Sequence, residues 1–463
     1  MRNLYPYLIC CLIVFSTFLQ CVTAQDLSGT WQGRMQFMKF DIRIVFRLYK
    51  DSTGNWHGTT ESPDQSSKKF DIDQLEVLGD SISFEIFDMN ASFQGRYNSD
   101  SSAIMGKLSQ RGFKLPLKLL KGDADDLLYN RPQRPRPPFP YTCEEVRIIQ
   151  RVSGDTLAGT FTKPNGPGKF PAIILISGSG AQDRDESVFG HKPFLLLADF
   201  LTRRGYAVLR CDDRGTGAST GNFSTATTAD FALDAEAQVA FLRHRKDIQR
   251  NRIGLLGHSE GGIIAPMVAA KDAKIAFVIL LAAPAIDMFD LLLAQDSLVS
   301  KSEGMKRKDM TELIETNTHL FNILKETKDT AGLQQKIVDY LVSINASDAE
   351  IEVAIQQLCT PWMEWYVGFD PAKNIARVKC PVLALNGEKD VQVPAMINIP
   401  VIESILVSSG NRNHEVSILP GLNHLFQPCK KCSVAEYKLI DQTMDPSVLE
   451  KIGVWMDRNV RRP

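Results

Sequence analysis

The residues with the clearest chemical potential lie in the sequence G-H-S-E-G at positions 257–261. An apolar run, 252–256, precedes this pentapeptide, and a run of small and apolar residues, 262–270, follows it. The pattern predicts a buried strand, a sharp turn and a helix, a setting that lifts a serine hydroxyl clear of a sheet. Glycines are expected on both sides of the turn because side chains would clash there. Ser259 is therefore the candidate nucleophile.

A serine hydroxyl needs a base, and the base needs an orienting carboxylate. Among the seven histidines, His424 is the candidate base because it follows the last predicted strand, in a loop expected above the carboxyl edge of the sheet. His258 lies on the wrong side of the turn to accept the proton. Asp390 is the candidate carboxylate because it follows the preceding predicted strand, and Glu388 is the alternative. The chain order Ser, Asp, His matches one of the known arrangements of such a triad.

A tetrahedral oxyanion needs backbone donors that are held in place. The N–H of Glu260, which follows the candidate nucleophile, is expected to be one donor. The second is expected from the glycine-rich loop after the predicted strand 172–176, with Ser179 as first choice and Gly180 as alternative. The same loop is expected to bring Gly180 and Gln182 to the substrate.

From about residue 143 the sequence alternates between strand and helix patterns, which predicts a mostly parallel, doubly wound sheet of the α/β class. The predicted elements are an antiparallel entry hairpin at 146–149 and 157–161, strands at 172–176, 206–210, 252–256, 276–281, 381–385 and 415–419, and helices at 193–204 and 229–245.

Residues 287–370 interrupt this alternation and carry helical patterns only, at 288–301, 309–327 and 332–343. Such an insertion is expected to form a helical cap over the carboxyl edge of the sheet, where α/β sheets place their ligands. Trp362 and Trp365 could line an apolar substrate pocket in this cap. Aromatic residues at this spacing are also typical of the packed core of a cap.

Residues 143–463 resemble the α/β-hydrolase superfamily, and the motif D-R-G-T-G-A-S at 213–219 is common there. More narrowly, S-G-S-G at 177–180 with Q-D-R-D at 182–185, and G-H-S-E-G-G at 257–262, are similar to a bacterial secreted group of serine esterases. Members of that group often carry an N-terminal β domain. Their usual His-Gly before the oxyanion residue is replaced here by Ser-Gly, which changes the neighbours of the donor.

This resemblance implies hydrolysis of carboxylic acyl esters through an acyl-enzyme, with a small-molecule ester as partner and with neither a cofactor nor a metal. Two other functions remain open. A serine peptidase of the prolyl-oligopeptidase type has the same turn and triad order, although no blade-length repeat of a propeller is found. A noncatalytic ligand-binding protein on a hydrolase scaffold is the third possibility.

Residues 25–122 show short alternating runs separated by turn signals, which predicts a small antiparallel β domain. Its opening, G-T-W-Q-G at 29–33, resembles the first strand of lipocalin-like barrels. The domain could capture a ligand or serve as a structural module. Residues 123–142 are rich in proline and arginine and are expected to form an extended, stiff linker to the catalytic domain, 143–463.

Residues 1–24 are expected to be a signal peptide, because an apolar stretch too short to span a bilayer is followed by small residues at a cleavage site. A membrane anchor and a lipoprotein anchor at Cys21 are the alternatives. We therefore expect an exported protein, periplasmic or extracellular, with no membrane association in the mature form. The formal net charge of −1 argues against nucleic acid as a partner. In the pair at 429 and 432, C-K-K-C, a local disulfide and free structural thiols are both possible.

Overall fold

The computed structural model describes residues 26–37, 40–62, 69–110, 112–122, 129–327 and 329–460. The chain forms two compact units, Met1–Ala124 and Asp125–Pro463. The expected signal peptide and its alternatives, including the anchor at Cys21, lie outside the described residues.

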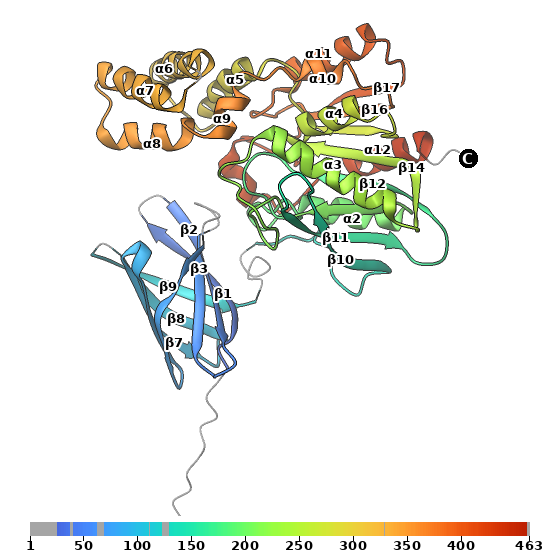
Figure 1. The fold of residues 1–463 in the computed structure, drawn as a ribbon. Coiled ribbons are helices and arrows are strands. Elements are labelled where there is room, and N and C mark those ends of the chain that lie inside the picture. The colour runs from blue at the N-terminus through green and yellow to red at the C-terminus, as the bar shows by residue number, and fades with distance from the viewer. Residues whose placement is uncertain are drawn as a thin grey trace, which may run out of the picture. The chain divides into compact units, whose positions relative to one another are not determined.

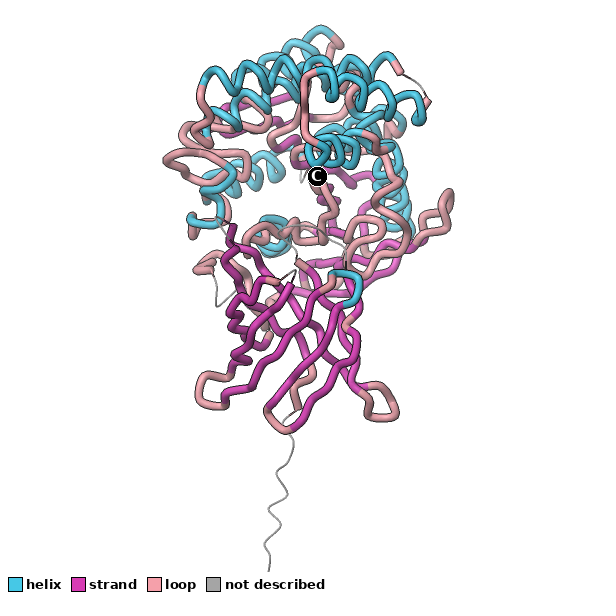
Figure 2. The backbone as a smooth tube through the Cα atoms, turned by 90° about the vertical axis from the view of Figure 1, so that its left-hand side faces the viewer, coloured by secondary structure: helices cyan, strands magenta, loops and turns pink. Residues whose placement is uncertain are grey.

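The first unit is an all-antiparallel sheet that closes nearly into a barrel (Figures 1 and 2). The strand order is β4-β3-β2-β1-β9-β8-β7-β6-β5. The strands are β1 (Gly29–Phe37), β2 (Phe40–Lys50), β3 (Trp56–Glu61), β4 (Lys69–Asp71), β5 (Asp73–Leu78), β6 (Ser81–Ile86), β7 (Ala91–Asn98), β8 (Ala103–Gln110) and β9 (Phe113–Lys121), with a short 3₁₀ helix, η1 (Phe87–Met89). The predicted β domain is thus confirmed as a small barrel.

Apolar side chains from alternate positions pack inside this barrel, as the period-2 pattern requires. Phe46, Phe84 and Phe93 form one aromatic cluster with ring centroids 4.8–5.2 Å apart. Trp31 is fully buried, and its indole N–H donates to the carbonyl oxygen of Leu27 at 2.8 Å. The buried tryptophan therefore has its polar atom satisfied.

The second unit is built on an eight-stranded sheet in the order β10-β11-β13-β12-β14-β15-β16-β17. The strands are β10 (Tyr141–Ile149), β11 (Thr156–Pro164), β12 (Phe170–Ile176), β13 (Ala207–Cys211), β14 (Ile248–His258), β15 (Val278–Leu281), β16 (Val382–Gly387) and β17 (His414–Leu419). β11 pairs antiparallel with both of its neighbours, β10 and β13, and all the other neighbouring strands pair in parallel. The predicted α/β-hydrolase class and its entry hairpin are confirmed.

Helices cover both faces of this sheet, and two separate apolar clusters mark the two faces. On one face lie α3 (Thr228–His244), α4 (Gly261–Lys271), α10 (Ala372–Ile375) and α11 (Ala395–Ser408), and on the other lie α2 (Pro193–Arg203) and α12 (Pro446–Asn459). Strands that are buried on both faces read as continuous apolar runs rather than alternating ones, which is why their positions could be predicted.

The helical insertion lies between β15 and β16, as predicted, and extends from the sheet as a group of five helices (Figure 1). These are α5 (Met288–Ser302), α6 (Arg307–Glu326), α7 (Thr330–Ser343), α8 (Asp348–Leu358) and α9 (Pro361–Tyr366). Leu324, Leu333 and Ile337 belong to a small apolar core of their own. Across the described ranges, none of the helices combines the length and apolar character that crossing a membrane demands.

The second half of the expected linker differs from the prediction of a stiff spacer. Arg131 is only 6% exposed, and its guanidinium donates to the carbonyl oxygens of Phe189 at 2.7 Å and Ile440 at 2.8 Å. Gln133 accepts from the N–H groups of Thr443 and Met444. A proline-rich pattern indicates an extended backbone, but it does not reveal that side chains between the prolines anchor this segment to its own unit.

Candidate active site

The backbone turns sharply between β14 and α4, and Ser259 sits at this turn with φ of +54°. A Cβ on Gly257 would come within 1.9 Å of the carbonyl oxygen of Gly261. A Cβ on Gly261 would come within 2.1 Å of the carbonyl oxygen of Ile176, at the end of β12. Only glycine fits at these two positions, so the turn expected from the sequence depends on them.

His424 and Asp390 meet at the carboxyl edge of the sheet. His424 Nδ1 lies 2.8 Å from Asp390 Oδ2, and both side chains are almost fully buried. The other carboxylate oxygen of Asp390 accepts from the N–H groups of Gln392 and Val393 at 2.8 and 2.9 Å. Because Nδ1 is directed to the carboxylate, Nε2 is the nitrogen left to exchange a proton with a nucleophile.

Hydrogen bonds of the Asn423 side chain hold the loop that carries His424. The buried Asn423 accepts from the N–H groups of Leu425 and Gln427 at 3.0 and 2.9 Å, and its own amide donates to the side chain of Gln427 at 3.0 Å. A few residues after these hydrogen bonds, Cys429 and Cys432 form a disulfide. Of the two states that the sequence allows for this cysteine pair, the structure has the disulfide.

The glycine-rich loop after β12 passes directly over the nucleophile, since a Cβ on Gly178 would lie 3.0 Å from Ser259 Cβ. Ser179, the expected oxyanion donor, is the next residue and is exposed. Among the hydrogen bonds of the described residues, none uses the backbone N–H of Ser179 or of Glu260. The oxyanion role of these two N–H groups stays a prediction.

Ser177 replaces the more usual histidine of this loop, and its hydroxyl donates to Asp213 Oδ1 at 2.9 Å. The backbone N–H of Gln182 donates to the other oxygen of Asp213 at 2.9 Å, and the Gln182 side chain donates to the carbonyl oxygen of Ser179. Burial raises the pKa of Asp213 well above its usual value. Gln182, expected to bind substrate, is thus engaged in bracing the loop.

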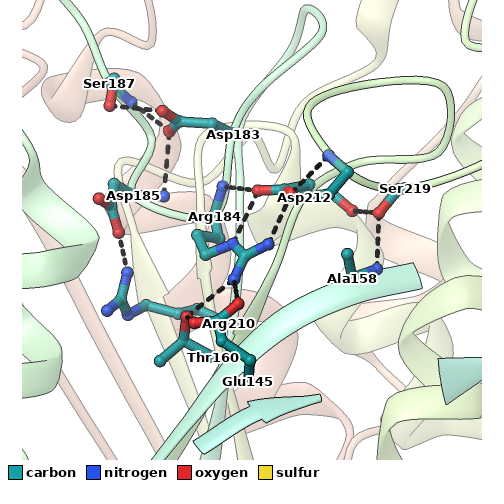
Figure 3. Close-up of polar contacts among 11 residues, drawn as sticks. Glu145, Ala158, Thr160, Asp183, Arg184, Asp185, Ser187, Arg210, Asp212 and Ser219 are labelled. Atoms are coloured by element: carbon teal, nitrogen blue, oxygen red, sulfur yellow. Dashed lines mark hydrogen bonds and ion pairs between the residues drawn. The ribbon is translucent and has the colours of Figure 1, made fainter. Parts of the chain in front are cut away.

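An ionic network holds the far end of this loop (Figure 3). Arg184 donates from Nε and Nη2 to the two oxygens of Asp212 at 2.9 and 2.8 Å, and it also pairs with Glu145. Burial would raise the pKa of Asp212, but the hydrogen bonds from Arg184 hold it below its usual value. The neighbouring Asp185 pairs with Arg210. Arg184 and Asp185 of the D-R-D motif therefore anchor the loop to β10 and to the end of β13.

The side chain of Glu260 is buried and has contacts that are separate from the predicted role of its backbone N–H. Its carboxylate accepts from Thr228 Oγ1 at 2.6 Å and from the indole N–H of Trp362 at 2.8 Å. Burial raises the pKa of Glu260, and these hydrogen bonds oppose the shift. Trp362 stacks on Tyr366 of the same helix at 4.4 Å, and its hydrogen bond to Glu260 links the cap to the start of α4.

Other residues singled out in the sequence lie apart from this cluster. Glu388, the alternative acid, is exposed and accepts from the backbone N–H of Gly421 at 3.0 Å. Gly180 is exposed, with φ of +94°. Trp365 stacks on Phe369 at 4.4 Å and packs against the sheet core. Within the described part of the chain, no three His, Cys, Asp or Glu side chains are grouped as metal ligands would be.

Two residues that the sequence analysis did not assign to the site have direct contacts with it. Glu186 Oε1 accepts from the N–H of Gly178 at 2.8 Å and lies 2.9 Å from His258 Nδ1. His258 Nε2 lies 3.1 Å from the carbonyl oxygen of His424. The available signal was a carboxylate directly after the Q-D-R-D run, in a loop already expected at the site.

Comparison with known proteins places this geometry in a family. The sequence model of the X-Pro dipeptidyl-peptidase (S15) family matches residues 153–399, more than half of the chain. The chain belongs to this family. Esterase EstD of Thermotoga maritima is 26% identical over 317 residues, which cover 68% of each protein. The protein is therefore a serine hydrolase of the α/β fold.

Solved structures similar to this chain include an esterase from Pyrococcus furiosus, with 15% identity and a TM-score of 0.43 over 72% of this chain and 98% of that one. The α/β hydrolase GrgF from a Penicillium species has 17% identity and a TM-score of 0.43 over 70% of this chain and all of the other.

Substituting Gly257 by Ala should disrupt the turn, because the added Cβ would meet the backbone of Gly261 and not a movable side chain. We expect the unfolding free energy to fall by at least about 1–3 kcal/mol and the hydrolase activity to be lost. Gly368→Ala is the matched control, since nothing lies within 4 Å of its added Cβ. Urea unfolding and ester hydrolysis measure both effects. Wild-type stability and activity in Gly257→Ala would contradict the tight turn.

Proposed function

We propose that this protein hydrolyses carboxylic acyl esters through a covalent acyl-enzyme on Ser259. His424 acts as general base and Asp390 orients it. The observation that carries the proposal is the buried 2.8 Å contact between His424 and Asp390 at the edge where the strained Ser259 emerges from β14. The match to EstD, which spans 68% of this chain, supports an ester as the substrate.

In this mechanism His424 Nε2 removes the proton from the Ser259 hydroxyl as the oxygen attacks the ester carbonyl carbon. The negative charge that develops on the carbonyl oxygen is stabilised by the N–H groups of Glu260 and Ser179. His424 then gives the proton to the departing alkoxide, and the alcohol leaves. A water molecule, activated by the same base, attacks the acyl-enzyme and releases the carboxylic acid. Asp390 stabilises the imidazolium that forms in each half-reaction.

The family match makes peptide-bond cleavage the second candidate, as in an X-Pro dipeptidyl-peptidase. An enzyme that removes dipeptides must bind the α-ammonium group of its substrate, and an unpaired carboxylate is the natural partner for that cation. The carboxylates next to the site already accept hydrogen bonds from the protein: Asp213, Glu186, Glu260 and Asp390. This occupancy favours ester hydrolysis over dipeptide release.

The activity should depend on Ser259 and favour esters. With p-nitrophenyl acyl esters, Ser259→Ala should lower kcat by roughly four to six orders of magnitude, as expected when a triad nucleophile is removed. Ser404→Ala, an exposed serine on α11, is the matched control. Parallel assays with dipeptidyl X-Pro anilides separate the two candidates. If the anilide is cleaved faster than the ester, and this activity is lost in Ser259→Ala, the protein is a peptidase and not an esterase.

The cap should determine which esters are cleaved and should not take part in the bond cleavage itself. Its aromatic residues contact Glu260 at the start of α4 and the sheet core near the site. Replacing Trp362 or Trp365 by Ala should shift the kcat/KM ratio between short and bulky esters by roughly 10- to 200-fold, the range for apolar pockets. Val353→Ala, exposed on α8, is the control. An unchanged ranking in the folded variants would assign specificity to the 177–191 loop or to the β unit.

A further inference from the structure

His258 is a buried histidine with hydrogen-bond partners on both ring nitrogens. The residue is 7% exposed. Nδ1 lies 2.9 Å from Glu186 Oε1, and Nε2 lies 3.1 Å from the carbonyl oxygen of His424. The residue immediately precedes Ser259, but its side chain is directed to the loops on either side of the nucleophile and not to the serine hydroxyl.

Both partners of this ring are acceptors. A carbonyl oxygen only accepts, and an ionised carboxylate only accepts. The oxygen of Glu186 that faces the ring also accepts from the N–H of Gly178 at 2.8 Å, so this oxygen acts as an acceptor. A neutral imidazole has one N–H and could satisfy only one of the two acceptors. Both contacts of His258 are hydrogen bonds only when the ring carries two protons.

The surroundings of the ring contain charges of the right sign for an imidazolium. Glu186 faces it from the loop after β12, and Asp390 acts on it from the loop after β16. The ring of His424 is a further titratable neighbour, at a centroid distance of 4.8 Å. His258 also lines a small cavity together with apolar residues of α2, β15 and the loop after β17, among them Phe194, Leu281 and Phe426. Burial lowers the pKa of His258, but the Glu186 carboxylate, the hydrogen bond to the carbonyl oxygen of His424 and the charge of Asp390 together raise it above the ordinary value.

We propose that His258 is a positioning residue that stays protonated at neutral pH and, with Glu186, clamps the oxyanion loop, the nucleophile turn and the base loop together. The inference rests on the proposed function, because the three segments it joins carry Ser179, Ser259 and His424. The clamp contains one hydrogen bond to each flanking loop, and Glu186 adds a third to the backbone of Gly178. It touches neither substrate nor reacting atoms, so it acts through the geometry of the other groups.

The clamp gives the reaction an alkaline limit. Since the folded-state pKa of His258 is raised, both hydrogen bonds are present at low pH and one is lost as pH rises through that pKa. A neutral ring that keeps its proton toward Glu186 turns a lone pair toward the carbonyl oxygen of His424. The base loop is then repelled from its position, so kcat should fall on the alkaline side while KM changes little.

The protonation state can be measured without substrate, by NMR of the full-length protein with ¹⁵N-labelled histidine. His258→Gln identifies the His258 signals, and His244→Gln identifies those of an exposed histidine on α3. We expect both ring nitrogens of His258 to carry protons at pH 7. A neutral His258 at pH 7 in the wild-type protein would overturn the proposal, whatever the variants do.

The kinetic test uses Glu186→Gln, with active sites counted by fluorophosphonate titration so that misfolded protein does not count. We expect kcat for ester hydrolysis at pH 8 to fall roughly 10- to 100-fold, the scale for losing a hydrogen bond to a charged group. The loss of kcat should be smaller at lower pH, because in this variant the alkaline fall of the kcat–pH profile begins at a lower pH than in the wild-type protein. His258→Gln should have no such alkaline fall, and His244→Gln should retain the wild-type profile.

The outcomes separate this inference from the proposed function. An alkaline limb that stays in place in Glu186→Gln and in His258→Gln would contradict the clamp but leave an esterase dependent on Ser259. Activity that survives in Ser259→Ala would refute the proposed function, while the NMR measurement would still report whether His258 is an imidazolium.

Discussion

The left-handed backbone of Ser259 is the constraint around which the rest of the second unit is arranged. A non-glycine residue in this region is strained by about 1–3 kcal/mol, and the strain persists only where the surroundings impose it. Here β14 on one side and α4 on the other leave no room for a relaxed turn, since side chains at positions 257 and 261 would meet backbone atoms. The strain is therefore held by two packed elements of a buried sheet, and it keeps the serine oxygen raised where other loops can reach it.

Those loops owe their positions to buried charges that are each matched by a partner. Arg184 with Asp212 fixes one end of the oxyanion loop, and Glu186 fixes its beginning through the N–H of Gly178. Asp390 holds His424 in the same way. A buried charge that lost its partner would be costly, so each of these contacts tolerates little displacement. The site is thus preorganised by electrostatics within loops that belong to a rigid sheet.

The sequence was informative where one local rule determines the outcome. The buried strands, the turn at 257–261 and the helical insertion follow from apolar periodicity and glycine placement, and the structure has them with small differences in bounds. Contacts between distant segments were not predictable in this way. Examples are the contacts of Arg131, the hydrogen bond from Trp362 to Glu260 and the pairing of Glu186 with His258. The last two join residues that are 72 or more positions apart in the sequence. No pattern in a single sequence indicates which of many charged or aromatic residues will meet.

Covalent labelling shows directly whether the raised hydroxyl of Ser259 is the nucleophile. The wild-type protein is treated with a fluorophosphonate until ester hydrolysis stops, digested, and mapped by tandem mass spectrometry. We expect one adduct per chain, on Ser259, and loss of labelling after denaturation. An adduct on Ser177 or Ser179, or full inhibition with Ser259 unmodified, would contradict it.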